Sequence, residues 1–139
     1  MSRGLGLVVL AVLLSVSIAC GDPPTSPSAA SISGTWSGSI TDSVAGPGAV
    51  RVSFGQSGTS LSGTWSSTFF QNPSNNNAGT LSGNVNGSSV SALLTPTVPG
   101  NCPFQVTATA NGSQTQMSGS YAAVSCSISV SGGLNLNKE

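Results

Sequence analysis

The sequence predicts an all-β domain, an antiparallel up-and-down meander of about eight strands that closes into a barrel, behind an N-terminal apolar helix. Three observations lead to this fold class. Hydrophobic residues alternate with Ser, Thr, Asn and Gly from Ile32 onward, no helical period follows the first 19 residues, and Gly-, Asn- and Pro-rich turns interrupt the alternation. We therefore divide the chain into residues 1–19, residues 20–31 and one domain of residues 32–139.

The first element is a short apolar segment that follows a single basic residue, Arg3. Leu5–Ala19 contains 15 apolar or small residues, fewer than the roughly 20 that a transmembrane helix needs. A basic start and a short apolar run that ends in small residues are the layout of a secretory signal peptide. A buried core helix is the alternative, but Pro-rich coil follows the segment and no other helix is predicted for it to pack on.

The end of this segment, Val16-Ser17-Ile18-Ala19-Cys20, resembles the lipobox of bacterial lipoproteins. The resemblance implies cleavage before Cys20, a diacylglycerol on its sulfur and an acylated amino group, so that acyl chains such as palmitate anchor the protein to a membrane. Gly21 stands where an Asp would imply inner-membrane retention, so the resemblance implies a place in the bacterial cell envelope, at the outer membrane. The alternative is a secreted protein in which Cys20 merely lies near the cleavage site.

The three cysteines of the chain are an odd number for an exported protein. If Cys20 is lipidated, Cys102 and Cys126 are left as a pair, and an oxidising compartment favours a disulfide between them. Cys102 shares parity with Phe104 and Cys126 with Ile128, both predicted to point inward, so we expect the bridge at one rim of the barrel. A metal site is the alternative, but two thiols without a histidine make a poor one, and we predict no metal and no cofactor.

Residues 20–31 form a linker between the anchor and the domain. The segment contains three prolines and no large apolar side chain, so it cannot bury enough surface to fold. We predict an extended tether.

Period-two alternation over short runs is typical of strands with one buried face. The inward positions are predicted to be the large apolar ones, and connections are expected at residues 46–48, 56–59, 72–78, 86–89, 96–101 and 111–112. A meander of eight strands closes into a barrel just wide enough for side chains or one small ligand, and a two-sheet sandwich is the alternative. The expected strands fall within residues 32–40, 50–54, 61–69, 81–85, 90–94, 104–108, 117–121 and 128–136.

Three short motifs, Gly34-Thr35-Trp36, Leu61-Ser62-Gly63-Thr64-Trp65 and Met117-Ser118-Gly119-Ser120-Tyr121, resemble strands of avidin and streptavidin, and more distantly the Gly-x-Trp start of lipocalins. Such barrels hold a small hydrophobic or cyclic ligand in the mouth, between aromatic walls. The alternative is that the aromatic side chains only fill a small barrel. The resemblance implies that the candidate ligand-wall residues are Trp36, Trp65, Phe69, Phe104 and Tyr121.

Charge is scarce, and this excludes several classes of function. Only 4% of residues are charged, against roughly 25% in a typical soluble domain, and there is no histidine. Without an imidazole, and with few carboxylates, we predict that the protein is not an enzyme and has no catalytic residues. No basic cluster is present, so we predict no nucleic-acid partner. Asp42 is expected at the barrel mouth, in a loose ion pair with Arg51.

Two functions are compatible with these features. The first is a lipid-anchored, non-catalytic structural or interaction module with a filled interior and a protein or glycan partner. This function is favoured because filled cores are common. The alternative is a barrel that binds a small apolar or cyclic molecule, which requires an open cavity beside Trp36 and Trp65.

Overall fold

The computed structural model describes residues 31–139, and the predicted signal peptide, Cys20 and almost all of the tether lie outside the described residues. Within the described part, eight strands follow one another, with a single turn of 3-10 helix after the third. No helix among these residues is long and apolar enough to cross a membrane. The elements are β1 (Gly34–Asp42), β2 (Gly46–Ser57), β3 (Ser60–Phe69), η1 (Pro73–Asn75), β4 (Asn77–Asn86), β5 (Ser89–Pro96), β6 (Phe104–Ala110), β7 (Gln116–Ala123) and β8 (Ser131–Lys138).

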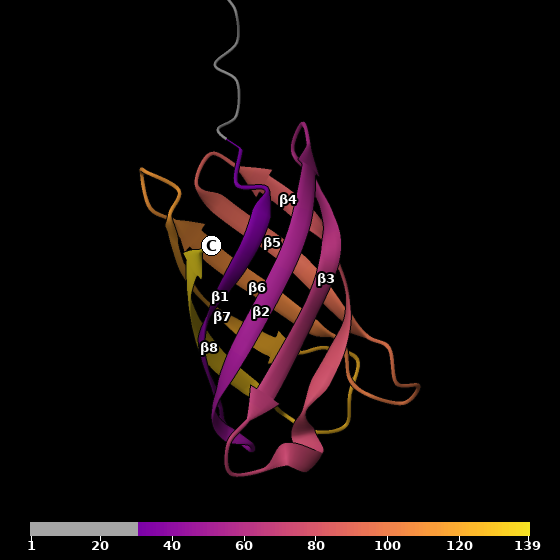
Figure 1. The fold of residues 1–139 in the computed structure, drawn as a ribbon. Coiled ribbons are helices and arrows are strands. Elements are labelled where there is room, and N and C mark those ends of the chain that lie inside the picture. The colour runs from indigo at the N-terminus through magenta and orange to yellow at the C-terminus, as the bar shows by residue number, and fades with distance from the viewer. Residues whose placement is uncertain (1–30) are drawn as a thin grey trace, which may run out of the picture.

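The sheet closes on itself (Figure 1). Each strand pairs antiparallel with the next, and β8 returns to pair with β1, where Ile40 lies opposite Leu134. The predicted all-β meander of eight strands in a closed barrel is therefore confirmed, and the alternative two-sheet sandwich is wrong. Closure leaves no sheet edge among these strands, which matters for a chain with few charges to protect one.

The inner face of the barrel follows the alternation in the sequence. On β3, Leu61, Trp65 and Phe69 are buried, and the residues between them are mostly exposed Ser and Thr. An inward glycine, Gly63, lies between two of these side chains, and a Cβ there would meet Cβ of Phe54 on β2 at 2.8 Å. Small inward residues thus let neighbouring strands approach closely while large ones fill the interior.

The predicted turn at residues 46–48 is in fact the start of β2. Gly46 and Gly48 pair with Asp42 and Ile40 of β1, so the connection consists of only the three residues before Gly46. The cause is the side chain of Asp42, whose Oδ1 accepts hydrogen bonds from the amides of Val44 and Ala45, both at 2.8 Å. This carboxylate stabilises a tighter turn than the glycines and proline alone would indicate.

The prediction that Ile128 lies on the inner face of a strand is also wrong. Ile128 is 60% exposed, and it lies in the connection between β7 and β8 rather than in a strand. Ser125 in this connection has a φ of 59°, a left-handed conformation that turns the chain out of the sheet, and β8 begins only at Ser131. The inward parity resumes with Leu134.

The end of the barrel at which the described residues begin and end is closed by side chains. Ile32 and Trp36 are fully buried there, and Trp36 Nε1 donates a hydrogen bond of 2.9 Å to the carbonyl oxygen of Ile32. The Ile32 amide in turn donates to Oε1 of Gln56, also at 2.9 Å. On this end the Nζ of Lys138 lies 5.7 Å from the centre of the Trp36 ring.

Candidate functional site: a cavity that opens at one end of the barrel

The barrel contains a cavity of about 310 Å³. Its walls are apolar side chains from all eight strands, and its opening lies among the connections β1–β2, β3–β4, β5–β6 and β7–β8. Because the strands alternate in direction, these four connections share the end of the barrel opposite to Ser31 and the C-terminus (Figure 1). The favoured interpretation of the sequence expected a filled interior. The cavity shows that side chains do not fill it.

Four of the five predicted ligand-wall residues line this cavity: Trp65, Phe69, Phe104 and Tyr121. Phe104 packs edge-to-face against two of the others, with ring centres 6.3 Å from Trp65 and 5.6 Å from Tyr121. Since Trp65, Phe104 and Tyr121 come from β3, β6 and β7, these rings form one aromatic surface across the interior.

The fifth predicted residue, Trp36, does not line the cavity. It lies at the closed end, where its ring stacks on Phe54 with centres 6.4 Å apart and planes 9° apart. The reason is its position on β1: Trp36 is near the start of that strand, and β1 runs from the closed end toward the mouth. Its structural role is to close the barrel beneath the cavity.

Exposed apolar side chains surround the mouth. Each of the four connections at this end carries one of them, with an exposed fraction of 61% for Val44, 69% for Phe70, 57% for Val98 and 60% for Ile128. Val44 and Ile128 also line the cavity. Large apolar residues inside otherwise polar turn segments are visible in the sequence and could have indicated these exposed side chains at the mouth. The rim of the cavity therefore carries large apolar side chains beside its polar residues.

The Asp42 carboxylate and the Tyr121 hydroxyl are hydrogen-bonded to each other at the mouth. Asp42 lines the cavity, and its Oδ2 accepts a hydrogen bond of 2.6 Å from the hydroxyl of Tyr121. Burial of the phenol, together with this hydrogen bond and the negative charge of Asp42, raises the pKa of Tyr121 far above its usual value, so the hydroxyl remains a donor. The side-chain partnership with Tyr121 was not predicted from the sequence.

The predicted ion pair between Asp42 and Arg51 is wrong. Arg51 instead forms an ion pair with Glu139, with 2.7 Å between Nη2 and Oε2. Arg51 lies opposite Ser37 in the pairing of β1 and β2, five positions along β1 from Asp42, and points outward toward the C-terminus. The pair is exposed to solvent, so it contributes little to stability.

Two side chains with polar atoms, Trp65 and Ser67, lie two residues apart on the cavity-facing side of β3. Both line the cavity and are buried, at 4% and 5% exposure. The indole Nε1 of Trp65 is buried and has no hydrogen-bond partner among residues 31–139. Buried donors in folded proteins are nearly always paired, so this one requires an explanation.

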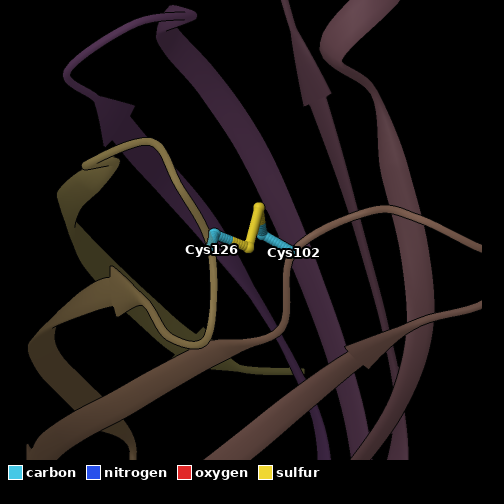
Figure 2. Close-up of a disulfide and its surroundings, with 2 residues drawn as sticks. All are labelled: Cys102 and Cys126. Atoms are coloured by element: carbon cyan, nitrogen blue, oxygen red, sulfur yellow. A yellow bond between two sulfur atoms is a disulfide. The ribbon is translucent and has the colours of Figure 1, made fainter.

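The predicted disulfide between Cys102 and Cys126 is confirmed (Figure 2). It joins the β5–β6 connection to the β7–β8 connection, with 5.8 Å between the two Cα atoms, and Cys102 lines the cavity. The bridge thus holds together two of the four connections that surround the mouth.

A second pocket, at the other end of the barrel, is lined mostly by polar side chains, among them Asn111, Gln116 and Asn137. Residues 31–139 contain no group of three or more His, Cys, Asp or Glu side chains that could hold a metal ion. Comparisons of the chain with protein-family models, with curated proteins and with solved structures found no match. The lipobox at Cys20 and the likeness to avidin therefore stay predictions from the sequence.

Proposed function

We propose that this protein is a binding module that holds a small apolar molecule in the cavity of its barrel. The observation that carries the proposal is the cavity itself, because it joins apolar walls, an aromatic surface and an open mouth in one place. Its volume of about 310 Å³ is at the lower end of the range of small-molecule sites. The apolar rim at Val44 and Ile128 supports the same class of ligand.

The cavity favours this function over a purely structural or interaction module, for which we expected a filled interior. It also favours binding over catalysis. Asp42 is the only carboxylate that lines the cavity, and hydrogen bonds from Tyr121, Val44 and Ala45 already occupy both of its oxygens. The raised pKa of Tyr121 keeps its phenol protonated, which is poorly suited to a general base.

The proposal includes a place for the module, in the bacterial cell envelope at the outer membrane, through a lipid on Cys20. The described chain starts at Ser31 beside the closed end, where Ile32 is buried. A tether that joins the domain there is attached at the end opposite to the mouth, so the attachment itself does not block the mouth.

A fluorescence titration tests the proposal. The probe is N-phenyl-1-naphthylamine, a neutral aromatic molecule whose emission rises in apolar surroundings, and the full chain is expected to bind it with saturation. Leu94→Trp adds a large side chain to the cavity wall and is expected to abolish that binding. Leu93→Trp makes the same change at the next residue, which is exposed and does not line the cavity, and is expected to bind as the unchanged protein does.

The two variants also define the results that contradict the proposal. Absence of saturable binding in the unchanged protein would show that the cavity does not take apolar molecules of this size. Equal loss of binding in Leu93→Trp and Leu94→Trp, or equal retention in both, would place the bound probe outside the barrel.

A further inference from the structure

The two tryptophans of the chain differ in one respect that points to the ligand. Trp36 Nε1 donates its hydrogen bond to Ile32, whereas Trp65 Nε1 has no acceptor among the residues that the structure describes. Both side chains are at least nine-tenths buried, at 0% and 5% exposure. A buried N–H donor without an acceptor costs free energy, and a partner that supplies the acceptor recovers it.

The cavity beside Trp65 is the space from which a ligand would supply that acceptor. Its neighbours in the pairing of β3 are Val52 and Gly79, which offer no side-chain oxygen, and its ring meets Phe104 edge-to-face. Trp65 lines the cavity, and so does Ser67, the buried polar residue two positions closer to the mouth. The wall of the cavity therefore carries a tryptophan whose buried N–H lacks an acceptor and, two residues along the same strand, a serine hydroxyl.

The charges of the described residues indicate that this molecule is neutral. Neither of the two basic side chains lines the cavity: Arg51 pairs with Glu139 outside the barrel, and Lys138 lies against Trp36 at the closed end. The carboxylate of Asp42 stands at the mouth. An anion would lose its hydration inside apolar walls with no cation to compensate, and it would pass a like charge on entry.

We propose that the ligand is a neutral molecule with an apolar body and one acceptor oxygen, of the carbonyl or ether kind, which accepts a hydrogen bond from Trp65 Nε1. This inference rests on the proposed function and makes it more specific. Trp65 selects such a ligand over an equally apolar one without an acceptor, because only the first pairs the buried donor.

A pair of probes of equal shape separates this inference from the proposed function. The ketone 2-acetylnaphthalene carries a carbonyl oxygen where 2-isopropenylnaphthalene carries a methylene group. We expect the full chain to bind the ketone about fivefold more tightly than the alkene, and the anion 2-naphthoate more weakly than either. Trp65→Phe keeps an aromatic ring but removes the donor, and is expected to bind the two neutral probes equally. Trp36→Phe is the matched control outside the cavity and is expected to keep the preference for the ketone.

The indole resonances give a readout that needs no variant to fold. In a ¹⁵N-labelled chain, the ketone is expected to move the indole N–H signal of Trp65 downfield, and to leave that of Trp36, which is bonded to Ile32, in place. Equal affinity for ketone and alkene, or a preference that persists in Trp65→Phe, overturns the inference while leaving the proposed function intact. Failure of both neutral probes to bind overturns both.

Discussion

Tyr121 and Asp42 are joined by a 2.6 Å hydrogen bond across β8, the strand that lies between them. Gly132 of β8 stands opposite both residues, Tyr121 on one side and Asp42 on the other. A Cβ at Gly132 would collide with the carbonyl oxygen of Thr41 and would lie 2.6 Å from the Tyr121 hydroxyl. The missing side chain thus lets the phenol reach the carboxylate, and the bond ties three strands together at the mouth.

The first prediction concerns the stability of the fold in alkali. Since the folded state raises the pKa of Tyr121 above its unfolded value near 10, the folded protein holds the phenolic proton where the unfolded chain has lost it. This contribution to stability is complete below pH 10 and is lost as pH rises, by about 1.4 kcal/mol of unfolding free energy per pH unit. Denaturant unfolding between pH 9 and 11 measures the slope, and Tyr121→Phe is expected to lack it.

The same prediction has an optical test, because Tyr121 is the only tyrosine in the chain. Tyrosinate absorbance near 295 nm is expected to be absent from the folded protein at pH 10.5 and to appear on unfolding. A titration midpoint near pH 10 in the folded protein would show that the bond to Asp42 does not form in solution.

The second prediction concerns Gly132. Gly132→Ala is expected to lower the free energy of unfolding by about 2–4 kcal/mol, because the new methyl group meets the Thr41 backbone and displaces the Tyr121 ring. Gly133→Ala is the matched control, since a Cβ there meets its nearest atom, Oγ1 of Thr41, at 3.5 Å, an ordinary contact. Chemical denaturation of both variants makes the comparison, and equal stability of the two would refute the steric argument.

The third prediction concerns the disulfide. Cys102 and Cys126 are 24 residues apart, and closing a loop of this length stabilises a fold by about 3–4 kcal/mol in the chain-entropy description. Reduction, or the double change Cys102→Ser and Cys126→Ser, is expected to lower the denaturation midpoint accordingly. It is also expected to weaken the binding of N-phenyl-1-naphthylamine, because two connections at the mouth are released. An unchanged midpoint after complete reduction would contradict the stabilising role.

The fourth prediction concerns the N-terminus, which lies outside the described residues. Mass spectrometry of the mature protein is expected to find Cys20 as its first residue, with the mass of a diacylglycerol and an added acyl chain. Cys20→Ser is expected to move the protein from the membrane to the soluble fraction. A mature chain that begins elsewhere, without lipid, would end the lipoprotein hypothesis.

The sequence predicted those features that depend on local pattern. Period-two alternation placed Leu61, Trp65 and Phe69 on the inner face, because a strand with one buried face must alternate. It failed at Ile128, where a positive φ at Ser125 ends the alternation before β8 begins. A backbone reversal of this kind at a serine leaves no mark in a pattern of hydrophobicity.

The candidate site depends on contacts that the local pattern does not contain. Tyr121 and Asp42 are 79 residues apart and meet only because the pairing of β7, β8 and β1 places Gly132 between them. The volume of the cavity is the volume that the strands enclose minus the volume of the side chains inside. The enclosed volume depends on how closely the strands approach one another. Four of the five predicted wall residues thus line the cavity, but the space between them was not predictable.

The central claim is that a small apolar molecule enters this cavity, and intermolecular nuclear Overhauser effects test it most directly. With N-phenyl-1-naphthylamine bound, protons of the probe are expected to contact the methyl groups of Met117 and Leu134, which line the cavity, and not those of Leu93 on the outer surface. Contacts confined to Leu93 and other outer residues, or no contacts at saturating probe, would contradict a binding site inside the barrel.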